Sequence, residues 1–531
     1  MSRRLWLAAL ALAVAPLLWN AWSAQRDGWV PEGDSATITL RTHDVLSAHP
    51  PLLGNPTNAG QAELADAYHP GPLEFYALAV PLRVLGPSGM LYGSAALVAA
   101  SVVAIGLLGR RIGGPTLGLA LLSCGAVLAW ALGDEIVHDP YNPHVLLLPY
   151  GLLLVSLLAC LCRDPIGLPV AVVAASWVAQ AHVLYAYPAA VASAAVVAAC
   201  WVRARPSRRL LAASAVTGAL LWLPPVLYEL GDGPSNVAAL LRAGRTSEAL
   251  AGPRYAWARA ADTLLEGAWL DRQRDAARLL SGPAVWIQVL LAVVLAALAY
   301  GGWRAHRDGR DRTAGLVVVA FVALLGSLVT AARTPTGLGI IEVHGHLHWW
   351  VTGAVVWTAA AWCAADELRR HVRVPVLAAG IPLVVAALLI AWTPSIDDDR
   401  GSASFGAVAA LTDATADALP SRGPWLVRAE GPQAFFSVES GLVTALVLRG
   451  FDAGVGEGEA VIYGSRHVVD EATAAGTIVI ASADDPPTVP DGFTLVARFD
   501  AVADAAATGH RNAGVFDHPQ QLAVWVSSAS G

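Results

Sequence analysis

Long apolar runs alternate with short polar stretches through most of this chain. A helix needs about 20 apolar residues to cross a bilayer, so the pattern predicts a polytopic α-helical membrane protein with about eleven transmembrane helices. The stretch 166–201 is divided in this prediction, because polar and aromatic residues interrupt it at 180–188. The predicted spans are 5–22, 88–109, 114–132, 143–162, 166–183, 184–201, 210–228, 284–302, 314–332, 347–365 and 374–392.

The arginines predict how the chain is oriented. One set of short loops between the predicted spans is rich in arginine, whereas the short loops of the opposite set contain only Arg333. Loops rich in basic residues remain on the cytoplasmic side, which predicts a multi-pass plasma-membrane protein with a cytoplasmic N terminus and an outer C terminus. The first apolar run could be a cleaved signal peptide, but Trp22 near the possible cleavage site favours a retained helix.

The hydrophilic segments predict two domains. Residues 1–392 form a transmembrane module, and residues 393–531 form a small extracytoplasmic C-terminal α/β domain. The predicted outer loops of the module are 24–87, 133–142, 229–282 and 333–346. In the C-terminal domain the pattern predicts helices at 402–419 and 433–449 and strands near 425–428, 460–463, 477–481, 493–498 and 522–526.

Composition supports a membrane protein and excludes several classes. Only 14% of the residues are charged, compared with about 25% in soluble proteins. The net charge is −7, which argues against nucleic-acid binding, and all 34 basic residues are arginine. Without lysine there is no Schiff-base lysine and no P-loop lysine. The five cysteines lie in or at the ends of apolar runs, so no disulfide framework is expected.

The first outer loop carries the strongest chemical pattern. Residues 35–46 have helical spacing, which places Asp34 at the N-terminal cap of a helix. Further on, the segment from His69 to Tyr76 reads His-Pro-Gly-Pro-Leu-Glu-Phe-Tyr and includes Glu74. The apolar stretch 73–85 is too short to span the membrane, so we expect an interfacial or re-entrant helix there.

Together these features resemble the GT-C membrane glycosyltransferases, in the branch near the protein O-mannosyltransferases and aminoarabinose transferases. The resemblance covers the whole chain as architecture and depends mainly on Asp34 and the His-Pro-Gly-Pro segment. It implies transfer of a sugar from a polyprenyl-phosphate donor at the outer face, with Asp34 as general base and His69, Glu74 and Tyr76 near the donor phosphate. A simple helix cap is the alternative for Asp34. Asp44 is the alternate base, or an exposed polar residue of the same helix.

The second outer loop places several carboxylates and histidines between two spans. We expect site roles for Glu135 and Asp139, with Asn142 and His144 beside them. Because hard cations prefer carboxylate oxygens, Asp34, Glu135 and Asp139 could together hold a divalent cation such as Mg²⁺ or Mn²⁺, although no cofactor is certain. The alternative is a solvated, turn-rich loop.

The loop before the tenth span contributes one arginine and three histidines. The Arg333 guanidinium could bind the donor phosphate, or it could snorkel to the membrane interface. His344, His346 and His348 alternate in the sequence, which brings them to one face only in an extended segment. We therefore expect these histidines to line a polar site rather than to bind zinc.

The predicted function is transfer of a mannose- or arabinose-type sugar from a polyprenyl-phosphate donor to a cell-envelope glycan, lipid or protein. Coding bias toward arginine and the resemblance point to an actinobacterial envelope enzyme in contact with membrane lipids. The rivals are a transporter or lipid flippase, and a non-catalytic sensor or scaffold. No Asp, Glu or Arg falls inside a predicted span, which argues against an ion pathway. The sequence contains neither a G-x-S-x-G nor an H-E-x-x-H motif of a hydrolase.

Overall fold

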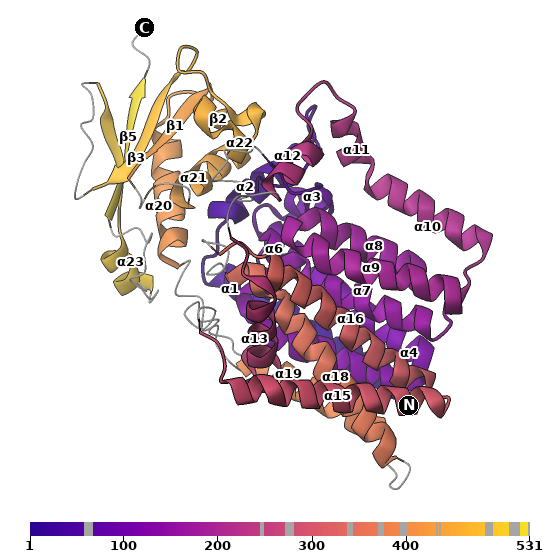
Figure 1. The fold of residues 1–531 in the computed structure, drawn as a ribbon. Helices are drawn as coiled ribbons and strands as arrows, with labels where there is room; N and C mark the ends of the chain where they lie inside the picture. The colour runs from indigo at the N-terminus through magenta and orange to yellow at the C-terminus, as the bar shows by residue number, and fades with distance from the viewer. Residues whose placement is uncertain are drawn as a thin grey trace.

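The chain folds as a bundle of long helices with a smaller α/β domain at one end (Figure 1). The N terminus lies at the opposite end of the bundle (Figure 1). The structure is a computed structural model, and it describes residues 1–57, 67–244, 249–270, 281–336, 343–369, 376–392, 402–431, 434, 437–483, 492–508 and 521–528.

Each predicted span falls on a helix or on part of one, as far as these residues extend. Among the described residues, six helices are long and apolar enough to cross a membrane, or seven if the bent pair α10–α11 forms one span. The helices of the bundle are α1 (Arg3–Arg26), α4 (Ser88–Leu132), α7 (Leu147–Leu161), α8 (Gly167–Ala181), α9 (Ala186–Ala199), α10 (Arg208–Leu221), α11 (Leu223–Glu229), α15 (Val285–Arg307), α16 (Asp311–Arg333), α18 (His348–Leu368) and α19 (Ile381–Trp392).

Two breaks in the bundle match breaks in the sequence pattern. Helix α4 is 45 residues long but leaves helical geometry at Gly114, where φ is 72°, so it contains the two spans predicted at 88–109 and 114–132. Glycine tolerates this left-handed conformation, and the next residue is Pro115. Helix α8 ends at Ala181, and the extended residue His182 separates it from the short 3₁₀ turn η2 (Val183–Tyr185) and from α9.

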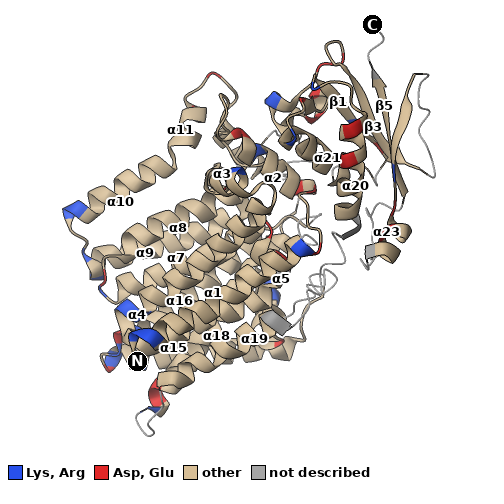
Figure 2. Cartoon of the chain, turned by 180° about the vertical axis from the view of Figure 1, so that it is seen from behind, with Lys and Arg blue, Asp and Glu red and all other residues tan. Residues whose placement is uncertain are grey.

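Charged residues are sparse along the middle of the bundle. Figure 2 shows basic residues gathered at the end where the N terminus lies, with helices almost free of charge between that end and the C-terminal domain. Desolvation of charged groups is costly in a bilayer, so this distribution fits helices that cross a membrane.

A set of short helices, which we call the loop layer, lies between the bundle and the C-terminal domain (Figure 1). It includes the predicted interfacial helix, whose Phe75 and Leu78 pack with Ile38 and Met90. The elements of the loop layer are α2 (Gly33–Asp44), α3 (Leu73–Leu85), α5 (Asp134–His138), α6 (Asn142–Val145), α12 (Asn236–Ala243) and the turn η5 (Val343–His346). Helix α13 (Gly252–Leu265) instead contributes Ala260 to the apolar core of the bundle, and the turn η4 (Ala268–Leu270) contributes Trp269.

The start of α2 differs from the prediction. Its N-cap residue is Glu32, whose carbonyl accepts the first helical hydrogen bond, 3.1 Å from Ala36 N. Gly33, with φ of 50°, follows it, so Asp34 lies in the first turn of the helix and is not its cap. A carboxylate in the first turn still interacts favourably with the helix dipole.

The C-terminal domain contains a five-stranded sheet in the order β2-β1-β3-β5-β4. Strand β1 is parallel to β2 and β3, whereas β5 is antiparallel to β3 and β4. Its strands are β1 (Trp425–Glu430), β2 (Ala453–Gly454), β3 (Gly476–Ser482), β4 (Thr494–Asp500) and β5 (Gln521–Ser528). Its helices and turns are α20 (Ser402–Ala418), α21 (Ser437–Leu448), η7 (Glu457–Glu459), α22 (Ala460–Tyr463), η8 (Ser465–His467) and α23 (Ala501–Thr508).

One element of this domain was predicted wrongly. Residues 460–463, expected as a strand, form the single helical turn α22. An apolar run of four residues fits either structure, and here it continues from the 3₁₀ turn η7.

Helix α21 of the C-terminal domain packs directly on α2. Leu40 of α2 belongs to the hydrophobic core of that domain. The Ser440 hydroxyl donates to Gly33 O at 3.1 Å, and the Thr444 hydroxyl donates to Ala36 O at 3.0 Å. The C-terminal domain therefore fixes the position of the helix that carries Asp34.

Candidate active site

The first and second loops of the sequence meet beside Asp34. The hydroxyl of Ser35, the next residue, donates a hydrogen bond of 2.6 Å to Asp139 Oδ1. Asp139 Oδ2 lies 3.4 Å from Nδ1 of His144. Asp139 is only 8% exposed and His144 only 6%. The alternative of a solvated second loop is therefore wrong, and the structure brings Asp139 of this loop to the helix of the predicted base.

Asp34 is well suited to accept a proton. Its side chain is partly buried, and burial raises the pKa of Asp34 to about 6, with the negative charge of Asp139 acting in the same direction and His144 opposing. Above pH 6 the carboxylate is mostly ionised, yet it is more basic than an ordinary aspartate. This is the range in which a carboxylate can act as general base near neutral pH.

Asp139 behaves differently in the same environment. Burial disfavours its charge, but the His144 ring and the Ser35 hydroxyl outweigh burial and lower the pKa of Asp139. The backbone N–H of Tyr141 also donates to Asp139 Oδ1, at 3.3 Å. Asp139 is therefore a fixed negative charge that orients the second loop, and Asp34 is the carboxylate left to exchange protons.

Glu74 completes what we call the carboxylate cluster of Asp34, Glu74 and Asp139. It lies in the first turn of α3 and is 4% exposed. Among the described residues, none makes a hydrogen bond to its Oε1 atom. Burial, and then the charges of Asp139 and Asp34, raise the pKa of Glu74 well above the usual value. Glu74 therefore stays protonated to higher pH than an ordinary glutamate, and the protonated acid can donate a hydrogen bond.

The His-Pro-Gly-Pro segment places His69 against the break between α8 and α9. His69 Nδ1 accepts a hydrogen bond of 3.2 Å from Val183 N, so the ring proton is on Nε2. His182, whose Nδ1 accepts from Leu184 N, has its ring centre 4.4 Å from that of His69. Burial lowers the pKa of His69 to about 3, with His344 acting in the same direction. The pair therefore offers two neutral N–H donors side by side.

Gly71 is required for this arrangement. Its N–H donates to Gln180 O at 3.3 Å, and a Cβ at this position would overlap the Gln180 side chain. Gln180 in turn donates to Leu221 O at 2.9 Å. The glycine thus allows the first loop to approach the end of α8 closely.

A third imidazole connects these donors to the carboxylate cluster. The rings of His182 and His344 are 5.9 Å apart, and Tyr141 lies 5.7 Å from His344 and 4.9 Å from His144. Burial lowers the pKa of His344 to about 4. We call His69, His182 and His344 the imidazole row. In the loop before the tenth predicted span, His344 lies beside these polar groups, in agreement with the expectation for its histidines. His348 instead forms a hydrogen bond of 2.9 Å with Ser327 inside the bundle.

Asn142 and Glu135 have supporting positions. Asn142 is 5% exposed and donates from Nδ2 to Ala181 O at 2.8 Å, which joins the second loop to the end of α8. Glu135 lies in α5, where its charge helps to raise the pKa of Glu32 to about 7, after burial as the main cause. Glu32 also bonds the Ser437 hydroxyl of the C-terminal domain.

Three predicted site residues lie elsewhere. Asp44 is held by Arg466 at 2.6 Å and by His467 at 2.8 Å, both from the C-terminal domain. Although burial opposes ionisation, these partners and His43 hold the pKa of Asp44 well below its usual range, so it is a poor base.

Arg333 is exposed at the end of α16. The Tyr76 hydroxyl donates to Pro51 O at 3.2 Å and so braces the first loop.

The residues present do not fit the expected divalent-metal site. Among the described residues, no group of three or more histidine, cysteine, aspartate or glutamate side chains is placed to hold a metal ion. Asp139 points its oxygens at Ser35, Tyr141 and His144, all of which compete with a cation for its lone pairs. The chemistry of the cluster therefore has to be derived from its own side chains.

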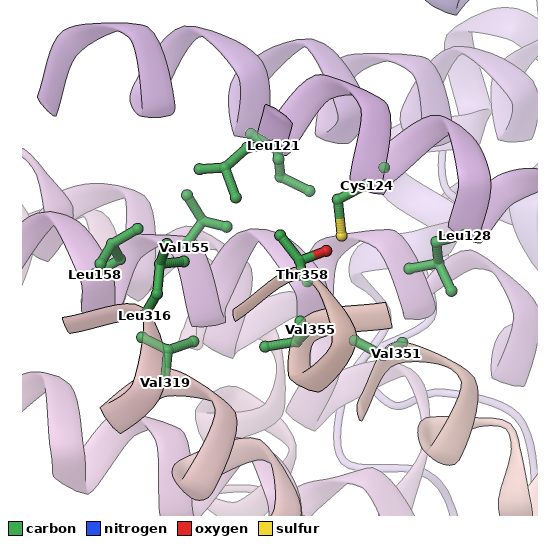
Figure 3. A pocket seen from close by; sticks show the side chains of 13 residues that line it. Leu121, Cys124, Leu128, Val155, Leu158, Leu316, Val319, Val351, Val355 and Thr358 are labelled. Atoms are coloured by element: carbon green, nitrogen blue, oxygen red, sulfur yellow. The ribbon is translucent and has the colours of Figure 1, made fainter. Parts of the chain in front are cut away.

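An apolar cavity lies inside the bundle, apart from these groups. It is lined by α4, α7, α16 and α18 (Figure 3). Its lining includes Leu121, Val155 and Val351, with Cys124 and Thr358 as the polar exceptions. It contains no acid or base, so catalysis has to be sought in the loop layer.

Two contributors were missed at the level of sequence. Ser35 follows Asp34 directly, and in a helix this places the two side chains about 100° apart, so Ser35 can reach Asp139 while Asp34 stays accessible. Arg41 is partly buried in the same helix, seven residues after Asp34. A separation of seven residues is about two helical turns, so the sequence would have indicated that Asp34 and Arg41 lie on the same side of α2.

Comparison with known proteins gave structural matches only. No protein-family model matches the chain, and no curated protein does. ArnT from Cupriavidus metallidurans bound to undecaprenyl phosphate aligns with 100% of this chain and 99% of its own, at 13% identity and a TM-score of 0.49. Apo ArnT aligns with 98% and 96%, at 12% identity and a TM-score of 0.46.

A third match is the Archaeoglobus fulgidus oligosaccharyltransferase in complex with Zn and sulfate. It covers 90% of this chain and 67% of its own, at 11% identity and a TM-score of 0.35. These enzymes are GT-C membrane glycosyltransferases, the group that the sequence resembles. A likeness at this level describes overall shape, and substrate and mechanism have to come from the residues of this chain.

Proposed function

We propose that this protein is a membrane glycosyltransferase that transfers a sugar from a polyprenyl-phosphate donor to an acceptor, with Asp34 as general base. The observation that carries the proposal is the convergence of Asp34, Glu74 and Asp139 with neutral imidazoles at one end of an apolar bundle. A lipid-linked sugar requires such an arrangement, because its prenyl chain stays in the bilayer while its sugar phosphate needs polar groups.

In the proposed reaction, Asp34 removes the proton from an acceptor hydroxyl as that oxygen attacks the anomeric carbon. The bond between this carbon and the phosphate oxygen breaks, and the polyprenyl phosphate leaves with the bonding electrons. By the resemblance to the GT-C group we expect direct displacement with inversion of the anomeric configuration. A positioned base of this kind contributes about 10² to 10⁴ in rate.

We propose that the imidazole row binds the donor phosphate. The Nε2–H groups of His69 and His182 can donate to phosphate oxygens without bringing a charge that burial would oppose. The raised pKa of Glu74 favours its protonated form, which can donate a further hydrogen bond and adds no repulsion toward the phosphate. Arg333, our expectation from sequence, is exposed at the end of a helix and is a weaker candidate.

The remaining sequence expectations become part of this proposal. Residues 1–392 are the catalytic membrane module, and residues 393–531 are an extracytoplasmic domain, with about eleven spans and a cytoplasmic N terminus. We propose a mannose- or arabinose-type sugar and a cell-envelope acceptor. The packing of α21 on α2 adds a structural role for the C-terminal domain, which holds the helix of the base.

The test is transfer of labelled sugar from a panel of polyprenyl monophosphate donors into envelope acceptors, with wild-type protein and Asp34→Asn in matched membranes. Transfer that depends on one donor and falls at least 100-fold in Asp34→Asn would support the proposal. Asp27→Asn is the matched control, because Asp27 is an exposed aspartate that pairs with Arg26 at the end of α1. Undiminished transfer by Asp34→Asn would remove Asp34 as the base. Absence of transfer from every donor would favour a flippase, transporter or sensor.

A further inference from the structure

Part of the contact between α2 and the C-terminal domain is positively charged, and we call this part the seam. It consists of Arg41 and Asp44 on α2 and of Gly464, Arg466 and His467 on the domain. A Cβ at Gly464 would lie 2.6 Å from Arg41 Nη1, so the guanidinium rests against the backbone of this glycine. The Gly464 φ of 87° favours glycine here for a second reason.

Among the residues that the structure describes, the Arg41 guanidinium has no partner of opposite charge at ion-pair distance. It is partly buried, and within the described residues no hydrogen bond or ion pair involves it. Burial lowers the pKa of Arg41, and Tyr68 and Asp44 are the groups whose charges oppose this shift. A desolvated cation without hydrogen bonds is unfavourable in a folded protein unless a ligand compensates it.

Asp44 cannot supply this compensation alone. Its carboxylate already binds Arg466 at 2.6 Å and His467 at 2.8 Å. The seam therefore contains two guanidinium groups, of which only Arg466 binds the single carboxylate directly. The Arg466 side chain remains 42% exposed, so it can bind a further group from solvent.

The seam lies between the helix that carries Asp34 and the C-terminal domain. Arg41 follows Asp34 by seven residues, which puts both on one side of α2 about 10 Å apart along its axis. The partner element at the seam is the C-terminal domain, and this domain lies at the end of the bundle, away from the apolar helices (Figure 1). We take this to be the acceptor side, because the prenyl chain of a donor would stay in the bilayer with the apolar helices.

We propose that the seam binds an anionic group of the acceptor, a phosphate or a carboxylate, with Arg41 as its main ligand and Arg466 beside it. This inference builds on the proposed function, since it names the chemical class of the acceptor. Planar guanidinium groups bind carboxylate and phosphate oxygens in pairs, which gives the seam its selectivity. The anion holds the acceptor so that a hydroxyl about two helical turns away meets Asp34.

The first experiment does not require turnover. The melting temperature of the full-length protein in detergent is measured against sodium phosphate, with sodium chloride at equal ionic strength as reference. We expect saturable stabilisation of the wild type, and at least a tenfold weaker phosphate affinity in Arg41→Gln and Arg466→Gln. Arg428→Gln is the matched control, since Arg428 forms an exposed pair with Glu471 on the same domain. No saturable effect on the wild type, or an unchanged affinity in Arg41→Gln, overturns the proposal.

A second experiment tests whether the seam binds the acceptor or the donor. A polyprenyl monophosphate is titrated against wild type and Arg41→Gln, and equal affinities are expected. Loss of polyprenyl-phosphate binding in Arg41→Gln would assign the seam to the donor and overturn the proposal. If Arg41→Gln does not fold, Arg466→Gln decides, because its side chain is half exposed.

The third experiment measures KM and kcat for anionic and neutral acceptors. Arg41→Gln should raise the KM for an anionic acceptor about tenfold with kcat retained, and leave the KM for a neutral acceptor unchanged. Equal changes in KM for both acceptors would overturn the proposal. If no sugar transfer occurs in any preparation, the proposed function fails, whereas the phosphate titration still decides whether the seam binds an anion.

Discussion

Ser35 and Asp139 are 104 residues apart in the chain and are joined by a hydrogen bond of 2.6 Å. This bond fixes the second loop beside the helix of Asp34. It also stabilises the charged form of Asp139, and that charge raises the pKa of Asp34. The basicity of the proposed base therefore depends on a residue of another loop.

The pH dependence of transfer should report this relationship. Because Asp34 has a pKa of about 6, kcat/KM should be flat above pH 7 and fall about tenfold per pH unit below pH 6. Asp139→Asn removes a charge that favours protonation of Asp34, so its acid limb should move to lower pH. The measurement is kcat/KM from pH 4.5 to 8 for both proteins. An acid limb that stays in place or moves to higher pH in Asp139→Asn would contradict this coupling.

Glu74→Gln should leave transfer at pH 7 within a few fold of wild type, since an amide resembles the protonated acid that the raised pKa of Glu74 favours. The stability effect has a definite sign. A buried acid with a raised pKa stabilises the fold fully below its unfolded pKa, near 4.5, and this contribution is lost as pH rises toward the folded pKa. The gain in melting temperature of Glu74→Gln over wild type should therefore be larger at pH 8 than at pH 5. Glu74→Leu serves as the contrast, because it lacks any donor and should lose activity at both pH values.

Gly71→Ala should reduce transfer strongly. The added Cβ would overlap Gln180, so the His-Pro-Gly-Pro segment would have to shift by some tenths of an ångström or more and carry His69 with it. The cost of such overpacking is about 1–3 kcal/mol in stability. Gly233→Ala is the matched control, since no heavy atom lies within 4 Å of a Cβ there. Melting temperature and transfer are measured for both, and similar behaviour of the two variants would remove the packing argument.

Asp44→Asn should loosen the C-terminal domain from α2. The change leaves Arg466 and His467 without their buried carboxylate, and breaking such a pair costs about 3 kcal/mol. Asp413→Asn breaks the exposed pair with Arg449 and should cost less than about 1 kcal/mol. We expect a lower melting temperature and weaker transfer only for Asp44→Asn. A loss of transfer with unchanged stability would instead return Asp44 to consideration as a base.

The spans and the first loop were accessible from sequence because their signals are local. Apolar runs of about twenty residues define helices without reference to the rest of the chain, and the division near His182 was visible from polar residues alone. Helix α3 has the bounds of its apolar stretch. That it lies at the membrane interface stays a prediction from its length.

The roles within the site were less accessible, because they depend on contacts between distant segments. Asp44 was a reasonable base in the sequence, yet its partners Arg466 and His467 lie more than 400 residues away. Arg333 was chosen for its isolation among short loops, but isolation in sequence does not place it near Asp34. Similarly, Ala460–Tyr463 was too short for its period to separate strand from helix.

The packing of α21 on α2 has a consequence for how the protein matures. Thr444 contacts Ala36 across 408 residues, so the helix of Asp34 emerges from the ribosome long before the element that holds it. The membrane module is therefore inserted with its base still unsupported. The proposed sugar transfer should therefore begin only after the C-terminal domain has folded and docked.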